Sequence, residues 1–532
     1  MPTDGGNVIQ VTFLCQSPDS PACCPAVPVE GYDASVRGTR TYFRGTAPVA
    51  AAAAVLIPLA VAGWPLAALI QTAASSDAVT LIRSDGEIRR AFTWAAIVAT
   101  VSSALGVVFG LASAYCWARL RYPGRAVQRG LAVAPLAIPA IVLATGVQAL
   151  FVPGTPASDF LSLLGVDPAR VRGGTGAVIV THTLIATASV GWLASTAWAS
   201  VDARKVDASR TLGVGRIRPA QIAVFPAVWP SALAGVGLAI LQAILSYNVI
   251  AILADGRETP EGLTVRLVLA GDQRATAVAL VTGGLALLIG LVAIQFLRSP
   301  GVEPRRRRPR QRPRGIDRVG ILMAAVLGLL VLGATVAMVA RAVDGGDGLT
   351  LSYLRGLFTG PQAIATREAA VGSVLAALPA AALTAVWGSL AGAALGRMQG
   401  VGGMLRAIGL LLPVGLSCAV LALGWQLAVR DVAVGDIDPR ITLPLVQAIV
   451  AFPLVAGIIA RMRPRQRWGR VAAARSLGAR RVLAWRVLCG PSYLTASLVT
   501  RDVMRPRVWP VSTGMRRCNS PSANTLALSM LR

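Results

Sequence analysis

Charged residues are scarce in this sequence. They make up 14% of its 532 residues, whereas a soluble domain carries about 25%. Hydrophobic residues reach 55%, and the mean hydropathy is +0.63. These values exclude a water-soluble enzyme with a polar shell. Several apolar runs are long enough to cross a bilayer, and they are continuous rather than alternating, which favours membrane-spanning helices.

Lysine and histidine are almost absent. Lys205 is the single lysine and His182 the single histidine. A phosphate-binding loop needs the dipeptide Gly-Lys followed by Ser or Thr, so the chain has no such ATP site and is not expected to be an enzyme. It also lacks a cluster of His, Asp, Glu or Cys suited to catalysis. We therefore predict no catalytic residue, no metal and no cofactor.

The seven cysteines show no CxxC pair with metal-ligand spacing. Cys116 and Cys418 lie in apolar runs and are expected to be packing residues. Cys15, Cys23 and Cys24 lie near the N-terminus, where free thiols are favoured over metal binding or pairing.

Ten apolar runs predict an all-α, polytopic transmembrane helical bundle. The predicted spans are 49–71, 91–118, 131–152, 175–199, 227–254, 276–297, 320–343, 368–396, 404–428 and 440–461.

Arginines concentrate on one side of these spans, which predicts their orientation. They precede the first span and follow the second and fourth, whereas Asp and Glu gather in the loops between. We assign the net charge of +27 to this asymmetry and expect a lipid bilayer, not nucleic acid, as the surrounding partner. The prediction is a multi-pass protein of a bacterial plasma (inner) membrane with a cytoplasmic N-terminus.

The composition divides the chain into five parts. Residues 1–45 have no signal-peptide pattern and are predicted to be a disordered extension, or the product of a start codon assigned too early. Residues 298–319 form an Arg- and Pro-rich segment, predicted to be a solvated cytoplasmic linker; a nucleic-acid or anionic-lipid contact is the alternative. The other parts are 46–297 with six spans, 320–491 with four spans, and a polar tail at 492–532.

The two apolar parts resemble each other. Arg119, Pro135 and Gly146 recur at an offset of 278 residues as Arg397, Pro413 and Gly424. Arg210, Gly213 and Pro226 recur at an offset of 265 as Arg475, Gly478 and Pro491. Repeats of six spans would run parallel, with a pathway between the halves.

The second repeat stops after its fourth span. A frameshift, an annotation error or a pseudogene would each explain this, and a truncation of that kind would remove one wall of the pathway and predicts an inactive transporter. A genuine ten-span protein is the alternative.

The spans contain no clear Asp or Glu, so an ion-driven transporter lacks its usual groups. His182 is expected to make an interhelical hydrogen bond rather than to relay protons. We infer that the energy comes from a partner.

The segment after the fourth span carries the strongest motif. Asp207-Ala-Ser is followed after three residues by Gly213 and, after nine more residues, by Ala223-Val-Phe-Pro226. This segment, here called the first coupling loop, resembles the EAA loop of ABC importer permeases, which docks in a cleft of the ATPase subunit. Its predicted site residues are Asp207, Ala208, Ser209, Gly213, Phe225 and Pro226.

A second copy follows the tenth span, which is the fourth of the second half. This second coupling loop departs from the pattern because Ala472 replaces the acid and Gly490 precedes the proline. Its predicted site residues are Ala472, Ala473, Ala474, Gly478 and Pro491.

Two such units in one chain resemble the fused permeases of type I ABC importers, binding-protein-dependent inner-membrane components, and most of all the thiamine and ferric-iron types. The resemblance implies two copies of an ATPase subunit, an extracytoplasmic substrate-binding protein, and thiamine or, next, ferric iron as the solute. Gln242, Ser246, Tyr247 and Asn248 in the fifth span are predicted either to line the pathway or to join helices. An ion-coupled secondary transporter and an inactive membrane scaffold are the competing functions.

Overall fold

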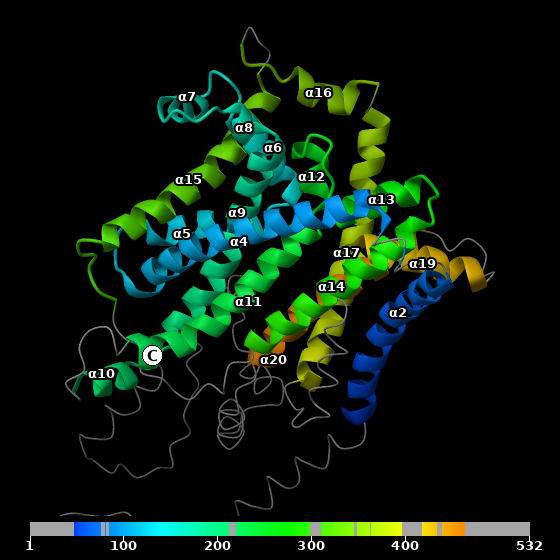
Figure 1. Cartoon of the computed structure of the whole chain (residues 1–532), viewed down its shortest axis with the longest axis horizontal. Helices are drawn as coiled ribbons and strands as arrows, with labels where there is room; N and C mark the ends of the chain where they lie inside the picture. Colours follow the sequence, from blue (N-terminus) through cyan, green and yellow to red (C-terminus); the bar gives the residue numbers. More distant parts are fainter. Residues whose placement is uncertain are drawn as a thin grey trace, which may run out of the picture. The chain divides into compact units, whose positions relative to one another are not determined.

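The computed structural model describes residues 47–75, 80, 84–211, 220–297, 310–344, 348–361, 363–395, 418–432 and 439–462 (Figure 1). In these ranges the secondary structure is helical, with no strand beyond two isolated β-bridges. The prediction of an all-α polytopic bundle is confirmed. Residues 1–45, the tail 492–532 and the whole second coupling loop lie outside the described residues.

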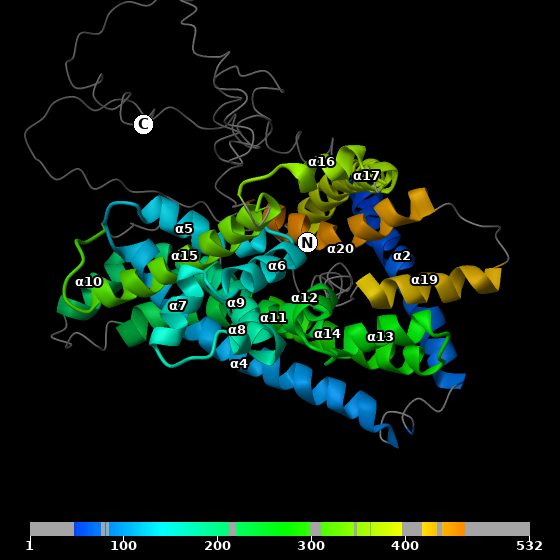
Figure 2. The same ribbon diagram turned by 90° about the horizontal axis from the view of Figure 1, so that it is seen from above.

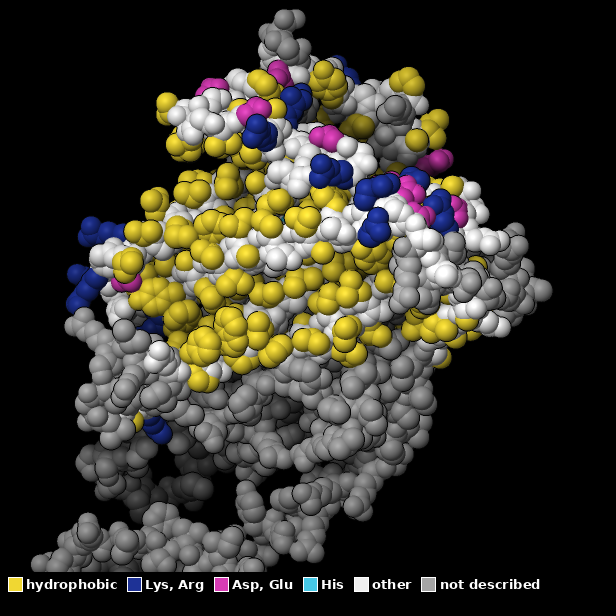
Figure 3. All heavy atoms as spheres, viewed as in Figure 1, with side chains coloured by type: hydrophobic (Ala, Val, Ile, Leu, Met, Phe, Trp, Pro, Cys, Tyr) yellow, Lys and Arg dark blue, Asp and Glu magenta, His cyan; other side chains and the backbone are white. Residues whose placement is uncertain are grey.

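Within the described ranges, six helices are long and apolar enough to cross a membrane, or seven if a bent pair counts as one span. Three further helices are apolar but shorter. Figure 3 shows hydrophobic side chains covering the middle of the visible face, with charged side chains at the edges of this area. The six spanning stretches are Gly86–Arg119, Gly174–Ala199, Phe225–Ile244, Arg274–Ala293, Asp317–Ala342 and Ala363–Gly392.

Helix α9 (Gly174–Ala199) is the central helix of the first half and is buried along most of its length. It packs against α4 (Gly86–Arg119) and α11 (Phe225–Ile244) through glycines. A Cβ placed on Gly110 would lie 2.9 Å from the Val190 Cβ, and one on Gly235 would lie 2.7 Å from the Val190 Cα. Small residues allow the helix backbones to approach this closely, as is usual in membranes.

The second half repeats this pairing with α17 (Ala363–Leu395) and α20 (Pro439–Met462). A Cβ placed on Gly388 would lie 2.6 Å from the Val455 Cβ. Gly388 follows Gly110 by 278 residues and Val455 follows Val190 by 265, the offsets of the sequence repeat. The same contact therefore occurs in both halves.

The first long helix of each half packs against the other half. Helix α15 (Asp317–Ala342) contacts α6 (Ala140–Leu150), where a Cβ on Gly146 would lie 2.7 Å from the Ala334 carbonyl oxygen. Helix α2 (Ala47–Ser75) contacts α19 (Cys418–Val432), where a Cβ on Gly424 would lie 2.6 Å from the Pro65 carbonyl oxygen. Both pairs can be followed in Figures 1 and 2. The exchange ties the halves together.

Two predicted spans are not single helices. The third (131–152) is divided into α5 (Arg125–Val133), a 3₁₀ turn (Ala134–Leu136) and α6, with a bend of 113°. Pro135 and Pro139 lie at the bend, and proline both lacks an N–H and clashes with the preceding turn. The fifth (227–254) is divided into α11 and α12 (Tyr247–Leu253).

The remaining helices are α7 (Pro156–Leu163), α8 (Ala169–Arg172), α10 (Ala203–Thr211), the π-helix η2 (Ala220–Val224), α13 (Pro260–Leu269), α14 (Arg274–Leu297) and α16 (Ser352–Thr359).

The end of the predicted 298–319 linker is attached to the bundle. The Gln311 N–H donates to the Arg119 carbonyl, and the Arg121 N–H donates to the Gln311 carbonyl, both at 2.9 Å. Helix α15 then begins at Asp317, whose carboxylate accepts from the Tyr115 hydroxyl at 3.1 Å. This part of the predicted solvated linker is therefore hydrogen-bonded to the bundle.

Candidate functional site

The break between α11 and α12 contains the predicted pathway residues. Helix α11 ends at Ile244 and α12 begins at Tyr247, with Ser246 as its N-terminal flanking residue. Ser246 is buried, and its hydroxyl lies 2.9 Å from His182 Nε2 on α9. The expected interhelical hydrogen bond of His182 is confirmed, and its partner is this helix break.

A buried carboxylate holds the start of α12. Glu261 on α13 is 7% exposed, and its Oε2 accepts from the Tyr247 N–H at 3.3 Å. Thr259 caps α13 by accepting from the Gly262 N–H at 3.3 Å. An amide at a helix start has no partner inside its own helix, so Glu261 replaces the bond that the break removes. In the sequence, Glu261 is one of the acidic residues between the fifth and sixth predicted spans, and nothing there indicates this contact.

Gln242, Tyr247 and Asn248 are exposed. They bracket the break along one short stretch of chain, between α11 and the first turn of α12. Amide side chains are costly to leave against lipid. These three side chains are not buried in a helix contact at the break, whereas the fourth predicted residue, Ser246, joins two helices.

His182 has one further feature. Its Nδ1 is buried and has no hydrogen-bond partner among the described atoms. Gln447 follows His182 by 265 residues, one of the two repeat offsets, and is exposed on α20. The two halves therefore place different chemistry at this position of the repeat.

The first coupling loop is described at both ends. Asp207 and Ala208 are exposed on α10, Ser209 belongs to the same helix, and Gly213 lies outside the described residues. Pro226 is in the first turn of α11, where its missing N–H costs nothing.

An aromatic pair that the sequence analysis missed follows this loop. Phe225 is 56% exposed and Trp229 41% exposed, and their rings stack at 5.3 Å and 18°. The i, i+4 spacing on α11 is the signal that could have revealed it. The residues predicted for the second coupling loop all lie outside the described residues.

Ion pairs gather around the N-terminal end of α4. Arg274 at the start of α14 contacts Asp85 at 2.6 Å and Asp272 at 2.7 Å. Asp85 also caps α4 by accepting from the Glu87 N–H at 2.7 Å. The hydrogen bond from Arg274 lowers the pKa of Asp85 and the pKa of Asp272.

Arg266 on α13 joins the same group. It contacts Glu87 at 2.5 Å and Glu258 at 2.8 Å, and the hydrogen bond to Glu258 raises the pKa of Arg266. These contacts connect the start of α4 with α13, the helix that carries Glu261. The part of the chain that the structure describes contains no group of three His, Cys, Asp or Glu placed to hold a metal ion.

Comparison with known proteins adds one relative, and no family model matches the chain. The chain is 30% identical over 224 residues to a probable molybdenum ABC transporter permease protein of Haloferax volcanii. The matched stretch is 42% of this chain and 80% of the relative. The relative is therefore roughly half as long as this chain.

Proposed function

Because this chain belongs to the family of ABC transporter permeases, we propose that it is the membrane subunit of an ATP-driven importer of a small solute. The observation that carries the proposal is the 30% identity, which extends over four-fifths of the relative. The six apolar helices and the repeated helix pairing support it. On this proposal the chain is not an enzyme itself, and ATP is hydrolysed by a partner.

The first coupling loop is the proposed contact with the ATPase subunit. The exposed Asp207 and Ala208 on α10 and the exposed Phe225 at the start of α11 give one polar helix and one aromatic residue to a partner. Aromatic side chains are enriched at protein interfaces. The π-helix between them is a type of helix that often occurs at functional sites.

The break between α11 and α12 is the proposed translocation path. Discontinuous helices in transporters expose backbone groups and polar side chains to the solute. Gln242, Tyr247 and Asn248 are exposed there, and the bonds from His182 and Glu261 hold the break in place. An external binding protein is the proposed donor of the solute.

The name of the relative directs the choice of solute to molybdenum, and we propose an oxyanion such as molybdate. Thiamine and ferric iron, the solutes that the sequence resemblance implies, are the alternatives. The proposed location is the plasma membrane, with the N-terminus and the first coupling loop on the cytoplasmic side.

Uptake by the reconstituted complex tests the proposal. Proteoliposomes containing the chain, its ATPase subunit and its binding protein should accumulate labelled molybdate only when ATP is present on the ATPase side. Labelled thiamine and ferric iron are measured in parallel, and accumulation of either one instead would overturn the solute assignment. Uptake that follows an ion gradient without ATP would show a secondary transporter, and no uptake of any of the three would support a scaffold.

A further inference from the structure

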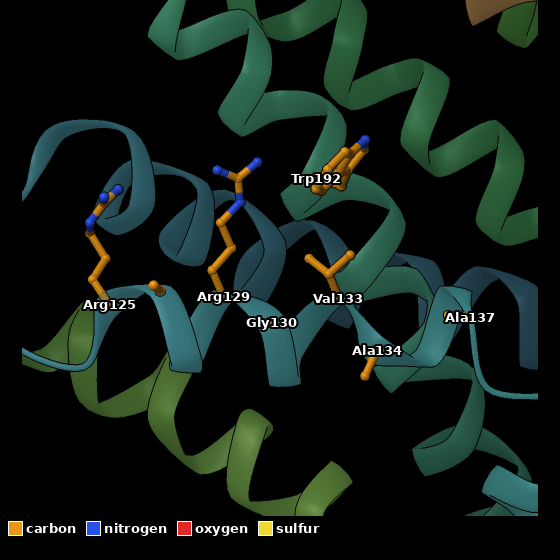
Figure 4. Close-up of a pocket in the computed structure, with 8 residues that line it drawn as sticks. Arg125, Arg129, Gly130, Val133, Ala134, Ala137 and Trp192 are labelled. Carbon is orange, nitrogen blue, oxygen red and sulfur yellow. The ribbon is translucent and has the colours of Figure 1, made fainter. Parts of the chain in front are cut away.

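We propose that the groove between α5 and α9 binds the phosphate headgroup of an anionic phospholipid, with Arg125 and Arg129 as its ligands. The groove has a volume of about 410 Å³. Figure 4 shows Arg125, Arg129 and Val133 projecting from one face of α5, with Trp192 of α9 beside the Arg129 guanidinium.

Both arginines are held in place before any ligand arrives. Arg125 Nη1 donates to the Trp117 carbonyl at 2.7 Å. The Arg129 guanidinium lies 4.9 Å from the centre of the Trp192 ring, a cation–π contact. Because these contacts already restrict both side chains, little side-chain entropy remains to be lost on binding. A guanidinium also presents several N–H donors in one plane, which suits phosphate oxygens.

The charge of the groove is of one sign. Its lining contains two arginines and no carboxylate. An anion bound between them would offset their like charges. Helix α5 adds to the attraction because its N-terminal flanking residue is Gly124, with φ 72°, and no side chain caps it. The free amides at a helix N-terminus favour a nearby anion.

The other end of the groove is apolar, which selects a lipid over a free anion. Val133, Ala134 and Ala137 line it, and the neighbouring Leu136 and Ile141 are 40% and 46% exposed. Trp192 is 42% exposed between the two ends, and tryptophan is enriched where headgroups meet hydrocarbon. The occupant that fits has a phosphate at one end and an acyl chain at the other.

Binding of phosphatidylglycerol by the intact chain tests this site. Native mass spectrometry of the chain in mild detergent, titrated with phosphatidylglycerol, should show one retained lipid whose affinity falls about tenfold in the double variant Arg125→Gln/Arg129→Gln. The matched control is Arg89→Gln/Arg90→Gln. These arginines lie near the N-terminus of α4, whose C-terminus leads into α5, and this variant should retain the lipid. Thermal unfolding of each variant checks that it is folded.

A second variant tests the apolar end without changing the charge. Ala137→Phe fills the groove from an exposed position and should also reduce retention of phosphatidylglycerol. Equal retention of phosphatidylcholine, or displacement of the lipid by millimolar inorganic phosphate, would overturn the assignment to an anionic lipid. Unchanged retention in both variants would overturn the site itself.

Discussion

Gly388 of α17 lies so close to Val455 of α20 that a Cβ on the glycine would come 2.6 Å from the Val455 Cβ. The first half contains the same contact between Gly110 and Val190, at 2.9 Å. Four residues separated by the repeat offsets thus make two equivalent helix contacts. A chance similarity between two apolar sequences would not reproduce a close contact at both positions.

Gly388→Ala should destabilise the protein. The added Cβ overlaps Val455 and lies 3.1 Å from the Phe452 carbonyl oxygen, and such overpacking costs about 1–3 kcal/mol. Gly372→Ala on the same helix is the matched control, because nothing lies within 4 Å of its Cβ position. That control should be neutral or gain about 0.5–1 kcal/mol from better helix propensity. Thermal unfolding in detergent measures both, and equal midpoints for the two variants would contradict the α17–α20 contact.

The exchange of first helices predicts a second sensitive glycine. Gly424→Val should separate α19 from α2, because the atoms in its way are the Pro65 backbone oxygen and carbon at 2.6 and 2.9 Å, which cannot rotate aside. Gly63→Val on α2 is the control, since its Cβ position is open. Limited proteolysis should release fragments of the second half faster from the Gly424 variant. No difference between the two variants would show that α2 does not pack there.

The positions of the spans could be predicted from the sequence because runs of apolar residues and arginine-rich loops are local signals. The bend at Pro135 and Pro139 could have been predicted from the two prolines. The break at Ser246 could not, because the residues around it are compatible with a continuous helix and the break depends on His182 and Glu261, which are distant in the sequence.

The exchange of α2 and α15 was likewise not predictable. The repeat showed which residues correspond, and not which half each helix contacts. Asp207 and Ala208 lie on α10 and Phe225 and Pro226 lie on α11, and their role in coupling stays a prediction. The Phe225–Trp229 stack required the helix register of α11.

Ser246→Ala should destabilise the break. It leaves His182 Nε2 buried with no partner, in a ring whose Nδ1 already has none among the described atoms, and the cost of such a loss is about 1–3 kcal/mol. Ser246→Thr keeps the hydroxyl and should restore most of the loss. Asn248→Ala, at an exposed position, should change the unfolding midpoint little while reducing transport. A wild-type midpoint for Ser246→Ala would refute the role of this bond.

The Asp85–Arg274 pair predicts an acid-sensitive stability. The pKa of Asp85 is lowered in the folded protein by Arg274, so the pair stabilises the fold above the unfolded carboxyl pKa of about 3.9 and loses this contribution as the pH falls through the folded pKa. Asp85→Asn keeps a capping side chain and removes the charge, so its unfolding midpoint should fall less on acidification below about pH 4.

The control for this experiment is Asp167→Asn. Asp167 lies before α8 and accepts from the Ala169 N–H at 3.0 Å, and its replacement should leave the acid-dependent loss of stability as it is in the wild type. Parallel pH profiles for the wild type and Asp85→Asn would show that the ion pair contributes nothing measurable.

Gly213→Asp tests the first coupling loop. A coupled permease should lose uptake, because the substitution introduces a bulky, charged side chain at the proposed turn of the ATPase contact. Gly213→Ala is the milder comparison and should retain more activity. A scaffold would tolerate both substitutions. The amount of each variant in the membrane is measured beside uptake and should equal that of the wild type.

Recovery of partners from native membranes tests the central claim most directly. The tagged chain is purified in mild detergent, and every protein recovered with it is identified by mass spectrometry. The account predicts an ABC ATPase subunit, in about two copies per chain, and an external binding protein whose affinity for molybdate, thiamine and ferric iron can then be measured. Recovery of abundant, intact chain with no ATPase subunit would contradict the account.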